Sequence, residues 1–217
     1  MRRFLTAAGI GLALMASPAL ANMTTLTTTL NQSNTFADGV DYGSVKVEAD
    51  DSTGFVKFTV DATTAPYSSI GSNFGFQAFG FNTTPSTLAS GLTIVTQPTG
   101  WSFNATGGTL DGFGFYLINE DGTGSTRQDP LVFTVKTASN ADAVASNFFA
   151  LSTGIAAQGN AHYAAHLAGF GDTTGLDGSP YSSHFIADGD IVIPAPGAVL
   201  LGAMGLGLVG WVRKRVN

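Results

Sequence analysis

The sequence predicts an all-β fold, an antiparallel β-sandwich of jelly-roll type, over residues 22–192. Short runs in this region alternate between apolar and polar residues with a period of two, and Gly, Asn, Asp, Pro and Ser separate the runs. The residues that favour helices, such as Lys, Glu and Gln, are scarce there. Because no helical segments connect the runs, we expect antiparallel pairing and two sheets packed face to face.

Three runs show the alternation most regularly, over residues 44–49, 56–60 and 131–136. Each has one apolar face and one polar face, which is typical of a sheet that is wet on one side. The residues predicted to face the core are Val45, Val47, Ala49, Val56, Phe58, Val60, Leu131, Phe133 and Val135.

Further strands are expected where β-branched and aromatic residues gather between turn-forming pairs such as Asp177-Gly178. Met23–Asn31, which is rich in threonine, is predicted as an edge strand or a frayed terminus. Ala138–Ser146 is the one short helix expected. The other predicted strands are Phe74–Phe81, Leu92–Thr96, Trp101–Phe103, Phe113–Ile118, Phe148–Ser152, His162–Leu167 and His184–Ala187.

A Phe-Gly-Phe triplet occurs at 74–76, 79–81 and 113–115. In a strand the two rings of a triplet face one side, and the glycine leaves a gap on the other side that a cross-strand aromatic can cover. The triplets favour core packing, and a flat aromatic platform for stacking sugar rings is the alternative.

Residues 22–193 hold four basic and fifteen acidic residues, a net charge of −11. Such a charge repels nucleic acid and anionic lipid, so we expect no nucleic-acid partner. Cations or neutral surfaces such as exopolysaccharide are the expected counterparts. The chain has no cysteine, which excludes thiol chemistry, cysteine-based zinc sites and disulfides.

Residues 1–21 have the order of a secretory signal peptide. Two arginines precede an apolar stretch at 4–16, and the small residues that a signal peptidase recognises follow at Ala19 and Ala21. We expect cleavage by signal peptidase after Ala21. The apolar stretch is shorter than the ~20 residues that span a bilayer, so a lasting N-terminal anchor is not expected.

Residues 193–217 combine a turn, an apolar helix and a basic end. Pro194 and Pro196 cannot lie inside a helix, so the helix is predicted to begin near Pro196. The uncharged residues 197–212 extend about 24 Å as a helix, and snorkelling side chains can lengthen this towards the ~30 Å of a bilayer core. We expect one transmembrane helix in the inner membrane, stopped on the cytoplasmic side by Arg213, Lys214 and Arg215.

This arrangement resembles the PEP-CTERM family of bacterial sorting signals, which have a Pro-x-Pro turn, a Gly/Leu-rich helix and a terminal basic cluster. Ala195 stands where the family usually has glutamate. The resemblance implies recognition by an exosortase-type processing enzyme, removal of the tail, and release or attachment of the domain at the cell surface. The residues that carry the resemblance are Pro194, Ala195, Pro196, Gly197 to Val212, Arg213, Lys214 and Arg215.

Two kinds of metal site are compatible with the sequence. His162 and His166 lie four residues apart on one face and, with His184, can supply three zinc ligands; alternatively one histidine packs in the sheet and the others are solvated. Acidic residues crowd the turns and offer hard oxygen ligands for a structural calcium ion, without an EF-hand pattern. Asp121, Asp188 and Asp190 are the main acidic candidates.

The sequence lacks the nucleophile-elbow, zinc-protease and phosphate-loop motifs, and it predicts a protein that is not an enzyme. We expect an exported surface or extracellular-matrix protein that is anchored transiently in the inner membrane. A carbohydrate-binding β-sandwich module is the alternative, and a secreted hydrolase that uses loop carboxylates is a further one.

Overall fold

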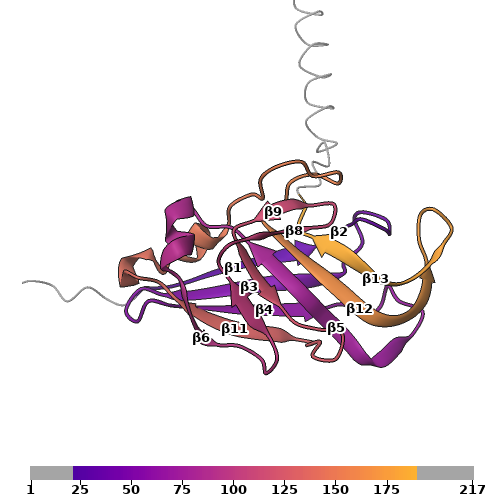
Figure 1. Cartoon of the computed structure of the whole chain (residues 1–217), viewed down its shortest axis with the longest axis horizontal. Coiled ribbons are helices and arrows are strands. Elements are labelled where there is room, and N and C mark those ends of the chain that lie inside the picture. Colours follow the sequence, from indigo (N-terminus) through magenta and orange to yellow (C-terminus); the bar gives the residue numbers. More distant parts are fainter. Residues whose placement is uncertain (1–21, 190–217) are drawn as a thin grey trace, which may run out of the picture.

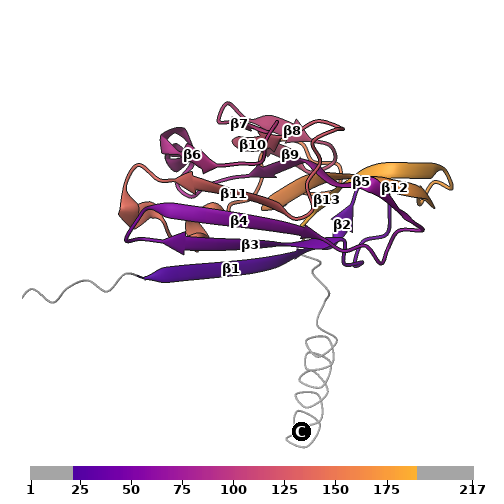
Figure 2. The same ribbon diagram turned by 90° about the horizontal axis from the view of Figure 1, so that it is seen from below.

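Two antiparallel sheets pack face to face, in a computed structural model that describes residues 22–189 (Figures 1 and 2). The first sheet has five strands in the order β1-β3-β4-β11-β6, and we call it sheet A. Its strands are β1 (Met23–Leu30), β3 (Gly43–Asp50), β4 (Phe55–Ala62), β11 (Leu131–Lys136) and β6 (Thr93–Thr96).

The second sheet, sheet B, has six strands in the order β2-β13-β12-β5-β10-β7. A separate two-stranded hairpin, β8–β9, lies over its outer face. The strands are β2 (Gln32–Ser33), β13 (Pro180–Ala187), β12 (Tyr163–Thr174), β5 (Ile70–Phe81), β10 (Ile118–Asp121), β7 (Ser102–Asn104), β8 (Gly108–Leu110) and β9 (Gly114–Tyr116). The all-β, antiparallel, sandwich-like fold predicted from the sequence is confirmed.

The alternating runs form the three central strands of sheet A, and the side chains predicted to face the core do so. Val47 on β3 lies opposite Phe58 on β4, and Phe58 lies opposite Phe133 on β11. All three side chains are fully buried, whereas Lys46, Lys57 and Lys136 point from the same strands to the other face. The nine predicted core residues of these strands are all buried.

Aromatic rings from both sheets meet in the main core. The ring of Phe58 stacks on that of Phe133 at 4.7 Å between centroids, and it lies 4.6 Å from Phe81 of sheet B. Phe79 stacks in turn on Tyr163 of β12. Large rings in close offset contact bury much apolar area, so this cluster stabilises the packing of the two sheets.

Sheet B is also covered on part of its outer face. A second apolar cluster, which contains Tyr116 and Phe113, packs there against Ala164 and Ala187. Gly80 of β5 makes room for it, because a Cβ at Gly80 would lie 2.9 Å from the ring of Tyr116. The triplet pattern predicts an aromatic from a paired strand over this glycine, whereas Tyr116 comes from the overlying β8–β9 hairpin.

Three expected elements differ in the structure. The predicted strand Phe113–Ile118 is divided between β9 and β10, which belong to different sheets. Phe148–Ser152 contributes only an isolated bridge at Ala150 and no strand. The predicted helix Ala138–Ser146 is two short 3-10 turns, η2 (Asn140–Asp142) and η3 (Ala145–Phe148). A third 3-10 turn, η1 (Ser86–Gly91), precedes β6.

Met23–Asn31 is the edge strand that the sequence allowed, β1, and it ends at Leu30. Within residues 22–189, none of the helices has the length and apolar character needed to cross a membrane. The predicted signal peptide at 1–21 and the predicted transmembrane helix in 193–217 lie outside the described residues.

Candidate functional site

The three histidines occupy three separate environments. His184 lies opposite Leu167 and faces the main core, whereas His166 lies opposite Phe185 and faces the second cluster. His162 precedes β12 and stacks on Phe149 at 3.5 Å between centroids. The zinc site that the sequence allowed from His162, His166 and His184 is therefore not formed, since β12 and β13 turn the imidazoles to opposite sides of sheet B.

His184 is the packed core histidine that the alternative interpretation expected. Its Nδ1 lies 2.8 Å from Ser33 Oγ, and its Nε2 lies 2.7 Å from the Tyr67 hydroxyl. Ser33 Oγ already accepts the backbone N–H groups of Thr35 and Phe36, so its own O–H is free to donate to Nδ1. The neutral imidazole then donates from Nε2 to Tyr67.

Burial lowers the pKa of His184 to about 3, which agrees with a neutral ring. The hydrogen bond between Ser33 and His184 resembles that of a catalytic serine and its base, but the resemblance ends there. Both side chains are buried, and the serine oxygen is committed to the turn after β2. This trio ties β2, β13 and the loop around Tyr67 together.

The acidic candidates are dispersed as well. Asp121 ends β10, Asp188 follows β13, and Asp190 lies outside the described residues. Within the part of the chain that the structure describes, no three His, Asp or Glu side chains gather in a way that could hold a metal ion. The calcium site proposed from acidic turns thus has no assembled ligand set there.

Glu120 is the unexpected carboxyl. It lies on β10 between Phe79 of β5 and Phe103 of β7, and none of its surface is exposed. Neither carboxyl oxygen has a hydrogen-bond partner. Burial, with the nearby charge of Asp121 as a smaller cause, raises the pKa of Glu120 to about 8. A buried carboxyl without a partner costs stability when it ionises.

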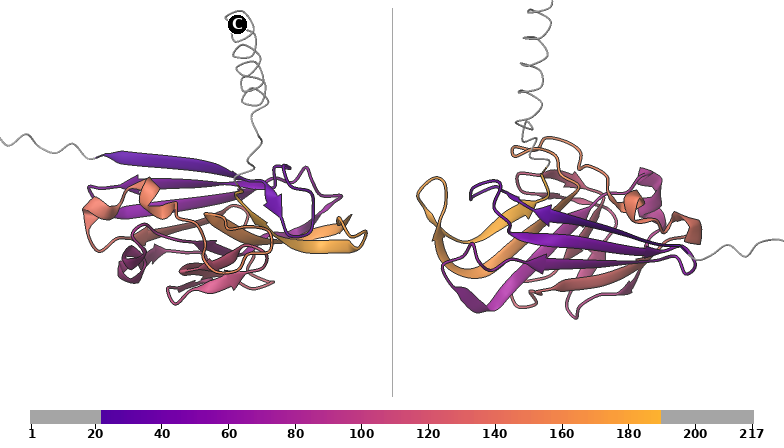
Figure 3. Two further views of the ribbon diagram at one scale, coloured as in Figure 1. Left: turned by 90° about the horizontal axis from the view of Figure 1, so that it is seen from above. Right: turned by 180° about the vertical axis from the view of Figure 1, so that it is seen from behind.

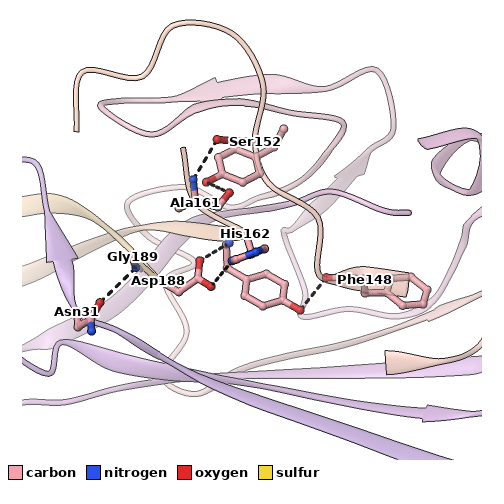
Figure 4. Close-up of polar contacts among 9 residues, drawn as sticks. Asn31, Phe148, Ser152, Ala161, His162, Asp188 and Gly189 are labelled. Carbon is pink, nitrogen blue, oxygen red and sulfur yellow. Dashed lines mark hydrogen bonds and ion pairs between the residues drawn. The ribbon is translucent and has the colours of Figure 1, made fainter. Parts of the chain in front are cut away.

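A polar network surrounds the last described residues (Figure 4). Asp188 accepts the backbone N–H of Tyr163 at 2.6 Å through Oδ1, and its Oδ2 lies 3.0 Å from His162 Nδ1. Its own N–H donates to the Tyr163 carbonyl, and Gly189 N–H donates to Asn31 Oδ1 at 3.2 Å. We call these five residues the terminal clasp.

The terminal clasp joins three segments that are far apart in the sequence. Asn31 links β1 to β2, His162 precedes β12, which begins at Tyr163, and Asp188 and Gly189 follow β13. Asp188 is almost completely buried, and this burial raises the pKa of its carboxyl while the hydrogen bond from His162 partly offsets the rise. The clasp thus holds the last described residues, Asp188 and Gly189, against the start of β12 and the β1–β2 connection.

The triplets do not form an open aromatic platform for sugars. Phe76, Phe79, Phe81 and Phe113 are fully buried, and the two remaining rings of the triplets, Phe74 and Phe115, are half-buried. A groove of about 400 Å³ lies instead on the outer face of sheet A, at the end where β3 and β4 meet. Its lining includes Phe55, Lys57, Glu48 and Asp50.

Sequence reasoning missed most partners of these groups. Asn31, Phe149 and Tyr67 belong to no recognisable motif. Tyr67 contacts His184, Phe149 contacts His162 and Asn31 contacts Gly189 only because distant segments pack together. Glu120 stands in Asn119-Glu120-Asp121-Gly122, a polar stretch that predicts a turn, although its first three residues are paired strand.

The predicted sorting and cleavage residues lie outside the described residues. They are Pro194, Ala195, Pro196, Gly197, Arg213, Lys214 and Arg215 for sorting, and Ala19 and Ala21 for cleavage.

Comparison with known protein families and with curated proteins found no match. Among solved structures, the chain is similar to one described under "pH-induced modulation of Streptococcus parasanguinis adhesion by Fap1 fimbriae". That alignment has 15% sequence identity and a TM-score of 0.31, and it covers 81% of this chain and 99% of the other. A likeness this distant carries no functional argument.

Proposed function

We propose that residues 22–192 are the ectodomain of an exported bacterial surface or extracellular-matrix protein with a structural or interaction role. Residues 193–217 are its sorting signal, with Pro194, Pro196 and the basic triplet Arg213 to Arg215 as the recognised features. The partners in this proposal are signal peptidase, an exosortase-type enzyme, the inner membrane and neutral exopolysaccharide.

The terminal clasp is the observation that carries the proposal. The last strand, β13, ends at Ala187, and Asp188 and Gly189 are bonded to the body of the sandwich directly afterwards. Pro194 follows five residues later. An enzyme that cuts at or after this turn removes none of the strands described between residues 22 and 189, so the released domain keeps their sheet contacts.

The engagement of the histidines supports a role other than catalysis. His184 is bonded through both ring nitrogens inside the core, and His162 is bonded to Asp188 and covered by Phe149.

The finer assignment of the sandwich as a jelly roll is also proposed. The alternation of β4, β5, β6 and β7 between the two sheets supports it, although the β3–β4 hairpin within sheet A departs from that topology.

Fractionation of host cells tests the sorting proposal. We expect the full chain to yield a processed product outside the inner membrane, and an unprocessed, membrane-bound product in a host that lacks the exosortase. Replacement of Arg213, Lys214 and Arg215 by alanine removes the cytoplasmic stop and abolishes normal processing. Lys136→Ala, a lysine on the outer face of sheet A, is the matched control. A full-length wild-type chain in the cytosol contradicts the proposal.

A further inference from the structure

Strand β1 presents a free edge of unusual length. It is the terminal strand of sheet A, and within residues 22–189 it pairs with β3 alone, over all 8 of its residues, Met23–Leu30. The strands at the other sheet edges are short: β6 has 4 residues, β2 has 2 and β7 has 3. Figures 2 and 3 show β1 along the outside of the sandwich.

This edge lacks the features that normally prevent pairing with another chain. Charged side chains, prolines and bulges usually protect a long edge strand. The sequence of β1, MTTLTTTL, has no charge, proline or glycine, and its register with β3 is continuous. Its threonines have high β-propensity. The edge is therefore suited to accept a further strand.

The same sequence is nearly symmetric about Leu26. Thr25 and Thr27 flank it, Thr24 and Thr28 follow, and only the outer positions differ, as methionine at 23 and threonine at 29. We propose that β1 is a homodimer interface, in which two copies pair antiparallel about a two-fold axis at Leu26. The two five-stranded sheets then join into one continuous sheet.

The side chains of β1 match their own copy in this register. Leu26 lies opposite Leu26 of the second copy, Thr24 opposite Thr28, and Thr25 opposite Thr27. Directly opposed threonines are favourable cross-strand pairs. Leu26 is only partly buried against the core of its own chain, and its open side is the part that the second leucine covers.

Charge favours a second copy over an acidic or basic peptide as occupant. Residues 22–193 carry a net charge of −11, yet β1 itself carries none. The nearest charged pair on β3, Lys46 and Glu48, is neutralised by a 2.7 Å contact between Nζ and Oε1. Two acidic domains can approach along this edge without opposed carboxylates. The hydroxyl of Thr24 accepts a hydrogen bond from the backbone N–H of Ala145. The turn η3 therefore lies on the core side of β1 and not along the edge that the second copy would occupy.

Cysteine cross-linking of the full chain, purified in mild detergent, tests the register. The protein has no cysteine of its own, so each introduced thiol is the only one. Opposed residues of antiparallel strands have Cα atoms about 4.5–5.5 Å apart, within disulfide range. We expect Leu26→Cys to form a covalent dimer under mild oxidation. Thr29→Cys, an exposed residue on the same strand, lies opposite Met23 and should remain monomeric on a non-reducing gel.

Two further results follow from the same register. A mixture of Thr25→Cys and Thr27→Cys chains gives a cross-linked heterodimer, whereas neither variant cross-links with itself. Leu26→Lys halves the mass measured by light scattering, while Thr59→Lys, on the outer face of β4, leaves it unchanged. The proposal is overturned if Leu26→Cys stays monomeric, if Thr29→Cys cross-links equally well, or if Leu26→Lys has the mass of the wild type.

Discussion

Glu120 is a single residue with a measurable effect on stability. Its pKa is raised from about 4.5 to about 8 in the folded protein. As the pH rises, Glu120 loses its proton at a lower pH in the unfolded chain than in the folded protein. The free energy of unfolding therefore falls between about pH 4.5 and 8. The loss is on the order of 5 kcal/mol when Glu120 is fully ionised.

We expect Glu120→Gln to reduce this loss. Chemical denaturation at a series of pH values should show that the variant gains on the wild type steadily between pH 5 and 8. Glu48→Gln, at a surface glutamate with a lowered pKa, is the control and should show no such gain. Parallel stability curves for Glu120→Gln and the wild type would rule out a buried, unpartnered carboxyl.

His184 shows the opposite dependence on pH. Its pKa falls to about 3, so protonation of the unfolded chain destabilises the fold as the pH drops below about 6.5. Nitrogen NMR should show His184 neutral, with the proton on Nε2, down to about pH 4. A titration midpoint near 6.5 would contradict the contacts with Ser33 and Tyr67.

The sequence allowed that one histidine packs in the sheet, but it could predict neither that this is His184 nor that Glu120 is buried. The face to which a strand residue points depends on the pairing partner and on bulges, and β12 shifts register between His166 and Leu167 against β5. That shift is not encoded in any local pattern. The acidic stretch at 119–122 has the composition of a turn, and only its pairing with β5 and β7 makes Glu120 part of the core.

At the scale of elements, the contact of the β8–β9 hairpin with sheet B depends on Gly80. A Cβ there would lie 2.7 Å from Leu110 Cδ1 and 2.9 Å from the Tyr116 ring. We expect Gly80→Val to destabilise the fold by about 1–3 kcal/mol, measured by urea unfolding, because the hairpin must shift outward. Gly124→Ala, where the nearest atom is 3.7 Å away, is the control and should be near neutral.

The terminal clasp can be tested through Asp188→Asn. The variant loses the charge-assisted bond with His162 and should be less stable by about 1–2 kcal/mol. Hydrogen exchange at Gly189 should increase, because its backbone is then less firmly held. Asp172→Asn, at a residue on the exposed end of β12, should change neither quantity. Unchanged exchange at Gly189 would show that the clasp does not restrain the chain.

A strand could be predicted from the sequence where one face of its sheet is exposed to solvent, because apolar and polar residues then alternate. Sheet A has an open outer face, so β3, β4 and β11 alternate regularly and were located from sequence alone. Sheet B is covered partly on both faces, so β12 has a run of buried residues that includes Ala164 and Ala165 and lacks clear alternation. The segment 148–152 is apolar enough for a strand, yet it packs as a loop.

At the scale of the whole molecule, the sandwich, the clasp and the predicted end signals give a coherent order of events. The last described residues, Asp188 and Gly189, are bonded to the sandwich and precede the predicted turn at Pro194. Under the proposed sorting, the domain folds after export, and removal of the tail takes away none of the strands described between residues 22 and 189. The long edge of β1 then remains available to a neighbouring copy.

Intact mass of the protein recovered from the cell surface tests this proposal most directly. We predict a single product that begins at Asn22 and ends close to the Pro194–Gly197 turn, with all strands from β1 to β13 retained. Recovery of the complete 217-residue chain, with both ends uncut and in the cytosolic fraction, would contradict it.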